Sequence, residues 1–581
     1  MPVTVSRTLA CRSSAAAMWE AVADTDRLNR AAGMAKVRYE AIAAPSGARI
    51  RGHTRLGPIP VTYDELPFEW EEPRRMHIRR EMVGGLLAWL ELTYVLEPAG
   101  DGCTLTATLS MEPRLSLLGP VLRLRLPAAV GELLAEMAVA DAAFAAGKPR
   151  PSPGPRVVVA DALARAADRL RAERPSAAND PLVALVRDGG DADVARIRPY
   201  ALADAWGLPR REVLSASLAA VPAGLFELRW EVVCPSCRVA ADRIPTLADL
   251  RDHGRCNLCD IAFDLDFDRA LEAVFAPAPA VRAVDVGPWC AAGPARTPHV
   301  LAQTLLPPGA EVALPAPAEA GRYRVFVRGG ETTPVTVADE GTAEGEAKGE
   351  PLLVAPGGTV RVASRHDDPR HAKLERADPT GDAATARDVT ALPAFRAHFS
   401  SDTLKPGITL RVSRVAVFFS DLTDSTRLYA RAGDAAAFRL VQDHFDVLRA
   451  PLESHGGVIV KTIGDAVMAV FADEDEALRA SLAALAAFRD FRRTGGLRGE
   501  VDLKLGVYAG SAYVCTANGV IDYFGQSVNI AARLQGTARA GELVVPAELA
   551  DRVEGAVVVE RFTPSLKGVE TPIPAVRLTV G

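Results

Sequence analysis

Two aspartates follow apolar runs near the C-terminus of this 581-residue sequence. Asp421 comes after the run at residues 415–419, and Asp465 comes after residues 458–463, before a second apolar run at 466–471. A strand that ends in this way would carry its last side chain to a shared edge of a sheet. Carboxylates are ligands that divalent cations prefer, and a pair of such cations can hold a nucleoside triphosphate. The two aspartates therefore predict a site for Mg²⁺ or Mn²⁺.

A third segment, residues 522–533, supplies polar groups at fixed spacing: Asp522, Asn529 and Arg533. Lys461 stands four residues before Asp465. Taken with the two aspartates, this set resembles the catalytic domain of the class III adenylate/guanylate cyclases. The resemblance covers residues 411–581 nearly end to end.

The resemblance implies roles for the metal and phosphate groups. Asp421 and Asp465 match the two family aspartates that bind a pair of Mg²⁺ or Mn²⁺ ions at each site. One ion would acidify the ribose 3′-hydroxyl and the other would hold the triphosphate. The small polar residues just after Asp421 lie where backbone N–H groups can cradle phosphates: Thr423, Ser425 and Thr426.

Asp424 departs from the family pattern, because many members carry glycine there. A carboxylate in a phosphate loop could repel the substrate, so we expect Asp424 to point outward or the loop to differ.

Four further residues would bind the nucleotide. Lys461 and Asp522 match the base-recognition pair; adenine offers an acceptor at N1 and a donor at its 6-amino group, so an ammonium and a carboxylate fit it. Guanine reverses both polarities, at about 1–3 kcal/mol or more for each unpaired group. Asn529 matches the residue that orients the ribose, and Arg533 the residue that stabilises the transition state. Lys567 matches a frequent triphosphate contact.

Each of these residues also has an ordinary structural interpretation. A single aspartate after a strand is more often a turn or cap residue. Asn529 alone could cap a helix, and Arg533 alone is usually a solvated surface group. The agreement of six positions in both identity and spacing favours the catalytic interpretation.

In the family, the metal aspartates of one chain face the base-reading residues of another across a head-to-tail dimer. Because this sequence carries both halves, the resemblance implies a homodimer with two composite sites. The expected activity is conversion of ATP to 3′,5′-cyclic AMP and pyrophosphate, a phosphorus–oxygen lyase reaction used in signal transduction. Two alternatives remain open: an inactive cyclase fold that senses nucleotide, which Asp424 would favour, or a hydrophobe-binding N-terminal module as the main function.

Composition excludes several classes of protein. The sequence is 49% apolar and 24% charged with a net charge of −6, which argues against a nucleic-acid coat or a polybasic membrane anchor. It has no apolar run of membrane-spanning length and no signal-peptide pattern at its start. We therefore expect a cytoplasmic protein that has no membrane partner and does not bind nucleic acid.

The order of apolar patterns predicts a multidomain α+β architecture. In residues 411–581, strand and helix patterns alternate as βαββαβ, a ferredoxin-like core. A linker helix is expected within residues 387–410, where it would transmit a signal or merely tether the domains.

Residues 1–147 have one short helical segment, a series of alternating strands and a long apolar helix at 115–144. This pattern resembles the START-like (SRPBCC, polyketide cyclase-like) helix-grip fold, whose apolar cavity would take a hydrophobic small molecule. Trp19, Trp70 and Trp89 would line that cavity or simply fill a core.

Residues 156–280 contain a helix, a glycine turn, a second helix and a strand, which resembles a winged helix. Only Arg210 and Arg211 lie at the start of the second helix, so packing or partner contact is favoured over DNA binding. Two Cys-x-x-Cys pairs within residues 234–259 predict a structural zinc ribbon with a closed thiolate site: Cys234, Cys237, Cys256 and Cys259.

Residues 281–386 are rich in glycine, proline and short β-type runs, which predicts a small β-sandwich. The acidic stretch at 339–351 is expected to be a solvated loop.

Overall fold

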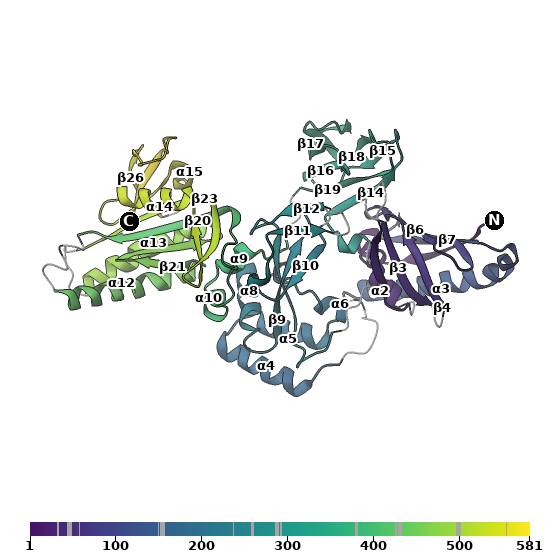
Figure 1. Cartoon of the computed structure of the whole chain (residues 1–581), viewed down its shortest axis with the longest axis horizontal. Helices are drawn as coiled ribbons and strands as arrows, with labels where there is room; N and C mark the ends of the chain where they lie inside the picture. The colour runs from purple at the N-terminus through teal and green to yellow at the C-terminus, as the bar shows by residue number, and fades with distance from the viewer. Residues whose placement is uncertain are drawn as a thin grey trace.

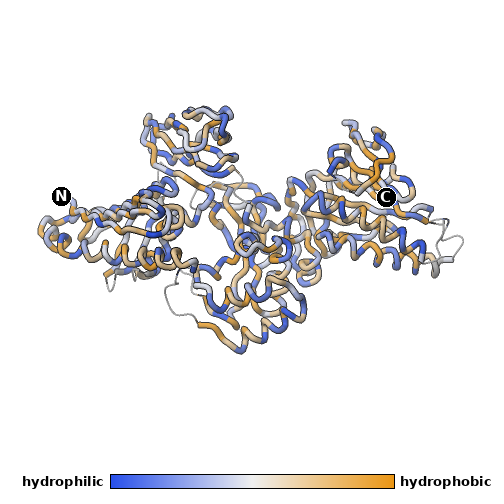
Figure 2. Tube along the Cα trace, turned by 180° about the vertical axis from the view of Figure 1, so that it is seen from behind, coloured by the Kyte–Doolittle hydropathy of each residue, from blue (hydrophilic) through white to orange (hydrophobic). Residues whose placement is uncertain are grey.

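The chain is elongated, with its N-terminal and C-terminal domains at opposite ends and two further parts between them (Figure 1). The computed structural model describes residues 1–31, 34–42, 49–56, 59–148, 150, 157–235, 238–256, 261–284, 290, 293–377, 381–424, 427, 433–494, 501–552 and 555–581. Hydrophobic residues are spread through every part of the molecule (Figure 2). No helix in these ranges is long and apolar enough to cross a membrane.

The N-terminal part has the predicted order of elements. It consists of β1 (Val3–Cys11), α1 (Ala15–Ala23), α2 (Thr25–Ala31), β2 (Arg38–Ile42), β3 (Arg49–Leu56), β4 (Ile59–Glu65), β5 (Glu69–Glu71), β6 (Arg75–Met82), β7 (Leu87–Ala99), β8 (Gly102–Pro113), η1 (Ser116–Leu118) and α3 (Gly119–Ala145). The strands pair antiparallel, and α3 packs against β1 and β8. The sequence pattern missed the second helix α2, the short turn η1 and the three-residue strand β5, which is too short to show an alternation.

Two of the three tryptophans that were candidates for a cavity lining fill the core instead. Trp19 and Trp70 are 5% and 4% exposed. The Trp70 indole Nε1 donates a hydrogen bond of 2.9 Å to the carbonyl of Val300, on a strand from much later in the chain. Trp89 is half-buried, with the Arg79 guanidinium 5.1 Å from its ring centroid.

The expected small β-sandwich is not a separate pair of sheets. Its strands are β14 (Val300–Leu306), β15 (Glu311–Pro315), β16 (Gly321–Val327), β17 (Thr332–Glu346), β18 (Leu352–Ala363) and β19 (Arg370–Arg376). They extend the N-terminal sheet through the pair β5–β14, in the order β1-β8-β7-β6-β5-β14-β19-β16-β17-β18-β15. The acidic stretch expected as a loop is largely strand, since β17 runs to Glu346 and pairs parallel with β18.

The middle of the chain is a helical module with a small sheet. It contains α4 (Ala160–Glu173), α5 (Asn179–Asp188), α6 (Asp191–Val194), α7 (Pro199–Trp206), α8 (Arg210–Ala219), β9 (Phe226–Val233), β10 (Ala240–Ile244), η2 (Leu247–Asp249), β11 (His253–Cys256), β12 (Ile261–Asp264) and β13 (Leu271–Pro277). The predicted helix, glycine turn, helix and strand are present, with Gly207 at φ +65° ending α7. However, residues 213–219 of α8 are all buried.

Buried in this way, α8 is not presented to a DNA groove. The Arg210 guanidinium pairs with Asp204 at 2.6 Å and lies over the Tyr200 ring. The Arg211 guanidinium donates to the carbonyl of Ser454 in the C-terminal domain at 2.6 Å. Arg210 therefore packs within the helical module, and Arg211 joins that module to the C-terminal domain.

The C-terminal domain has the predicted ferredoxin-like core. After η3 (Pro294–Arg296) and β14–β19, the chain continues through α9 (Ala386–Thr390), α10 (Pro393–His398), β20 (Leu410–Leu422), α12 (Asp434–Ser454), β21 (Val458–Ile463), β22 (Ala466–Phe471), α13 (Glu474–Thr494), β23 (Leu503–Ala517), β24 (Val520–Phe524), α14 (Gln526–Thr537), β25 (Glu542–Pro546), α15 (Ala547–Ala550), β26 (Ala556–Phe562) and β27 (Ala575–Val580). The sheet order is β21-β22-β20-β23-β25-β27-β26, with β24 paired to β23. Apolar side chains alternate along β20, so Ala416 and Phe418 join the core that contains α12 and α13, whereas Val417 and Phe419 face a second core shared with the helical module.

Candidate active site

The two predicted metal ligands lie at one edge of the C-terminal sheet. Strands β20 and β22 run antiparallel, and Ser420 is opposite Val467. This register brings Asp421, near the end of β20, beside the β21–β22 turn that carries Asp465. Gly464 gives that turn its positive φ of +65°, a conformation that glycine adopts without steric cost.

The surroundings of these carboxylates suit a cation. The Asp421 Oδ2 atom is 2.8 Å from the ammonium of Lys504, its cross-strand neighbour on β23. The Asp465 Oδ2 atom is buried and accepts no hydrogen bond among the described residues. A buried anionic oxygen without a donor is costly, so a divalent cation fits this pair of carboxylates.

His444, on α12, is a buried base close to this edge. Its Nδ1 atom lies 2.7 Å from the Val441 carbonyl, which places the proton of the neutral ring on Nδ1. Burial lowers the pKa of His444, and the negative charges of Asp465 and Asp421 oppose that shift. The ring also packs against Phe445 and Phe488 in the interior of the domain.

The predicted base-reading residues form an ion pair. The Lys461 Nζ atom, on β21, is 2.6 Å from the Asp522 Oδ2 atom on β24. The second oxygen, Oδ1, accepts a hydrogen bond of 2.8 Å from the Tyr523 backbone N–H. The Lys461 side chain is 40% exposed and that of Asp522 is 15% exposed, so the ammonium remains open to an incoming ligand.

Asn529 and Arg533 lie on α14, four residues apart, and therefore share one face of the helix. Gly525 precedes the helix at φ +133°. A Cβ atom added to Gly568 would lie 3.7 Å from both terminal nitrogens of Arg533. The turn that carries Lys567 therefore lies against Arg533. Both residues were predicted to act on the phosphate groups of the substrate.

The predicted phosphate loop is described only in part. The Thr423 N–H donates to the Asp502 carbonyl at 2.8 Å, and the Asp502 N–H donates to the Thr423 Oγ1 at 2.7 Å. This hydroxyl thus anchors the loop to β23, and its role as a phosphate ligand stays a prediction. Ser425 and Thr426 lie outside the described residues.

Asp424 points away from the loop, which was one of the two expectations for it. It has φ +52°, its side chain is 56% exposed, and its Oδ1 atom is 3.9 Å from the Arg427 guanidinium.

The linker helices hold both neighbours of Asp522. The Arg396 guanidinium on α10 donates to the Ile521 carbonyl at 2.7 Å. The Thr390 hydroxyl on α9 is 3.3 Å from the Tyr523 hydroxyl, and Tyr523 is 1% exposed. A helix was predicted in this linker, but its contact with β24 was not, because contacts between remote segments leave no local pattern in the sequence.

Within the described part of the chain, no hydrogen bond or ion pair joins Lys461 and Asp522 to Asp421 and Asp465. The carboxylate pair and the base-reading pair are thus two separate clusters on one chain.

The cysteine group is described in part. Cys234, just after β9, and Cys256, on β11, are buried in one small cluster with Ile261 and Phe263 packed against it. Cys237 and Cys259 lie outside the described residues. In the described ranges, no three histidine, cysteine or acidic side chains are grouped to hold a metal ion.

Two family descriptions match separate parts of the chain. Residues 409–572 match the "Adenylate and Guanylate cyclase catalytic domain". Residues 161–290 match a "Family of unknown function", DUF5939. The C-terminal domain is therefore a cyclase catalytic domain, and the helical module is similar to a family whose function is not established.

Individual relatives match one part of the chain. An uncharacterized protein of Mycobacterium tuberculosis is 33% identical over 162 residues, which are 28% of this chain and 40% of that protein. An adenylate cyclase of Mycosarcoma maydis is 31% identical over 166 residues, 25% of this chain and 6% of that protein. A receptor-type guanylate cyclase of Caenorhabditis elegans is 28% identical, over 26% of this chain and 15% of that protein. The match thus spans less than half the length of each relative, and both substrate types occur among them.

Among solved structures, the adenylyl cyclase CyaB of Pseudomonas aeruginosa is 22% identical, covering 30% of this chain and 97% of that one, with a TM-score of 0.27. The guanylyl cyclase Cya2 is 20% identical, covering 29% of this chain and 94% of that one, also with a TM-score of 0.27.

Proposed function

We propose that the protein is an adenylate cyclase, which converts ATP to 3′,5′-cyclic AMP and pyrophosphate at composite sites of a homodimer. The observation that carries the choice of ATP is the Lys461–Asp522 pair, 2.6 Å between Nζ and Oδ2, within a cyclase catalytic domain. The relatives include both adenylate and guanylate cyclases, so the assignment rests on these two side chains.

The pair suits adenine because its two charges match the two groups that distinguish the purines. The Lys461 ammonium can donate to N1, and the Asp522 carboxylate can accept from the 6-amino group. Guanine presents a donor to the ammonium and an acceptor to the carboxylate, which leaves both charges unpaired.

Asp421 and Asp465 would hold the two Mg²⁺ or Mn²⁺ ions that, when bound, acidify the ribose 3′-hydroxyl and neutralise charge on the triphosphate. The other residues act directly on the nucleotide. The Asn529 amide would orient the ribose, and the Arg533 guanidinium would stabilise charge that develops on the transferring phosphorus. Lys567, beside Arg533, would bind the triphosphate.

We infer a homodimer because the two clusters of one chain are not joined by any described contact. In a head-to-tail pair, the carboxylates of one protomer would meet the base-reading residues of its partner. Mutual orientation of the protomers would then govern activity, and the upstream domains could regulate it through α9 and α10, which hold the residues flanking Asp522.

The direct test is product formation by the purified full chain. With Mn²⁺ and ATP we expect cyclic AMP, and with GTP a rate lower by about tenfold or more. Asp522→Asn should lower kcat/KM for ATP by about 10- to 100-fold while sparing the GTP rate. Asp551→Asn, which removes an exposed carboxylate paired with Arg561 in the same domain, is the matched control. Absence of cyclic AMP at high protein concentration would refute the proposal.

Two further assignments rest on sequence. The zinc ribbon is supported by the shared burial of Cys234 and Cys256. We expect about one zinc per chain by metal analysis, lost in Cys234→Ser; a full chain free of zinc would refute it. We also propose that the N-terminal part is a START-like domain that binds a hydrophobic ligand. The location that we propose is the cytoplasm, where ATP is available.

A further inference from the structure

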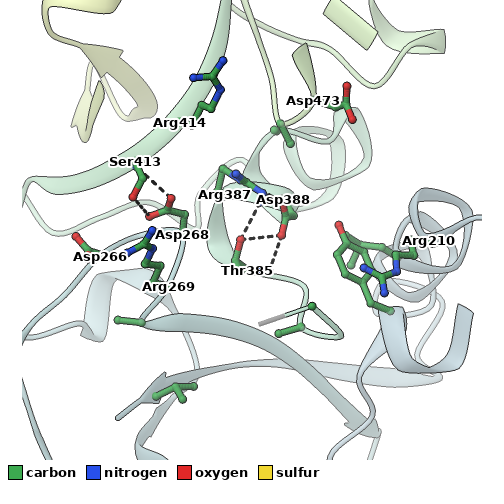
Figure 3. Close-up of a pocket in the computed structure, with 18 of the residues that line it drawn as sticks. Arg210, Asp266, Asp268, Arg269, Thr385, Arg387, Asp388, Ser413, Arg414 and Asp473 are labelled. Atoms are coloured by element: carbon green, nitrogen blue, oxygen red, sulfur yellow. Dashed lines mark hydrogen bonds and ion pairs between the residues drawn. The ribbon is translucent and has the colours of Figure 1, made fainter. Parts of the chain in front are cut away.

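A large cleft lies where the helical module, strands β16 and β19, the linker and the C-terminal domain meet. Its volume is about 1450 Å³. Arg210 and Arg269 come from the helical module, Arg387 and Asp388 from the linker helix α9, and Arg414 from β20 (Figure 3). The cleft is thus separate from the candidate active site and touches every part of the chain except the N-terminal end.

Charged side chains of both signs line this cleft. Nine arginines and seven carboxylates line it. Most of these arginines already have a partner. The pairs that they form within 4 Å are Arg210–Asp204, Arg238–Glu272, Arg324–Glu375, Arg376–Glu319, Arg387–Asp388 and Arg414–Glu474.

Arg269 and Arg322 are different. Both line the cleft and are exposed, and neither side chain makes an ion pair or hydrogen bond with a described residue. Arg269 precedes β13 in the helical module, beside Asp266 and Asp268 (Figure 3). Asp268 accepts hydrogen bonds from Ser413, and the Asp266 side chain makes no hydrogen bond or ion pair with a described residue.

A guanidinium presents a planar fork of donors that matches a phosphate or a carboxylate with two hydrogen bonds. Two such forks, on separate parts of the chain, suit a ligand with two anionic groups. The cleft is large enough to hold a small molecule, and its two uncommitted guanidinium groups could fix the orientation of such a ligand.

We propose that this cleft binds a small dianionic molecule through Arg269 and Arg322. The shared ligand chemistry is a pair of phosphate or carboxylate groups. Binding would join the helical module to strand β16.

The same cleft adjoins the start of the catalytic strand. The Ser413 N–H donates to the Asp268 Oδ2 at 3.0 Å, and the Phe267 N–H donates to the Arg411 carbonyl at 2.9 Å. Arg411 and Ser413 open β20, the strand that carries Asp421 near its end. A ligand that bridges Arg269 and Arg322 would therefore fix the segment that anchors β20.

The test is isothermal titration calorimetry on the full chain with two probes, inorganic pyrophosphate and citrate, in buffer freed of divalent cations by a chelating resin. Every protein in this test carries Arg533→Ala, so that the Arg533 guanidinium of the catalytic domain cannot bind the probe. We compare this parent with its Arg269→Ala/Arg322→Ala derivative. Arg123→Ala/Arg125→Ala is the charge-matched control, because it removes two exposed guanidiniums from α3.

We expect the parent and the control to bind one probe, and the Arg269→Ala/Arg322→Ala derivative to bind it at least tenfold more weakly. Tighter binding of pyrophosphate would indicate a phosphate ligand, and tighter binding of citrate a carboxylate ligand. Equal affinity in the parent and the derivative, or no binding of either probe at millimolar concentration, would overturn the proposal. Thermal melting of each variant checks that it is folded. If the double substitution unfolds the chain, Arg322→Gln alone replaces it in the comparison. The measurement does not depend on cyclase activity, so it stands apart from the proposed function.

Discussion

At the scale of single residues, Asp421, one of the two carboxylates that we propose to bind metal, is held by a positive charge that a cation must displace. Lys504 was not among the predicted site residues, yet its ammonium is 2.8 Å from Asp421. A cation entering the site competes with this ammonium for the same oxygen. Lys504 therefore occupies part of the position that a metal would take.

We predict that Lys504→Ala lowers the Mn²⁺ concentration for half-maximal activity by about two- to fivefold. The Lys504 and Asp421 side chains are 22% and 30% exposed, so removing the competing pair is worth only about 0.5–1 kcal/mol. Activity measured across a Mn²⁺ series gives the value, and Lys405→Ala, an exposed lysine before β20, is the control. A higher metal requirement in Lys504→Ala would mean that the ammonium helps to build the site.

A site residue could be predicted where the pattern that identifies it lies in one short stretch of sequence. Lys461, Asp465, Asp522 and Arg533 could be identified because their types and their spacing along the chain match the family pattern. The contact between Lys461 and Asp522 agrees with their predicted joint role. Lys504 could not be identified in the same way, because it reaches Asp421 through the register of two strands far apart in sequence.

At the scale of secondary structure, the linker helices α9 and α10 contact the strand that carries Asp522. Helix α10 reaches the backbone of β24 through Arg396, one residue before Asp522. Because β24 is short and carries Asp522, which we propose to read adenine, movement of α10 would move that carboxylate.

Arg396→Ala should raise KM for ATP by about three- to tenfold, with a smaller change in kcat. The substitution leaves the Ile521 carbonyl without its charged donor, a loss of order 1 kcal/mol, and loosens the position of Asp522. Steady-state kinetics with ATP in the full chain measure it. Arg489→Ala is the matched control, because Arg489 donates in the same way to the Gly581 carbonyl on the surface. If KM is unchanged, the linker does not position Asp522.

The apolar pattern predicted a helix or strand correctly where it persisted over many residues. The runs that became β20, β22 and α13 were predicted with small shifts at their ends, because alternation and helical spacing persist over many residues. The sandwich prediction failed for a different reason. Residues 300–376 do form strands, but the pairing of Gln303 with Trp70 on β5 has no signature in either segment alone.

At the scale of the whole molecule, one hydrogen-bonded sheet joins the N-terminal domain to β14–β19. His299 lies next to β14, at this junction, and is 5% exposed. Its Nε2 atom is 3.7 Å from the Glu375 Oε2. Burial, aided by nearby Lys373 and arginines, lowers the pKa of His299 to about 3.

This depressed pKa predicts an acid-sensitive junction. The unfolded chain binds a proton at His299 below about pH 6.5, whereas the folded chain stays neutral there until about pH 3. The stabilisation is thus complete above pH 6.5 and is lost progressively as the pH falls, by about 1.4 kcal/mol per pH unit. Between pH 6.5 and 5, we expect the free energy of unfolding to fall by about 2 kcal/mol more in the unmodified chain than in His299→Gln.

Denaturant melts at each pH provide this comparison. His253→Gln, whose ring is 71% exposed, is the control and should follow the unmodified chain. Parallel curves for the unmodified chain and His299→Gln would show that His299 does not titrate in this way.

The assembly itself carries the central claim, that each chain brings metal-binding carboxylates to one site and base-reading and transition-state residues to the other. The measurement that tests it most directly is complementation between Asp421→Ala and Arg533→Ala chains. Each variant alone should be nearly inactive, and the mixture should regain up to about a quarter of the unmodified activity, because random pairing of equal amounts makes half the dimers mixed and each of these has one intact site. A mixture that stays as inactive as its components, although size analysis shows mixed dimers, would contradict the account.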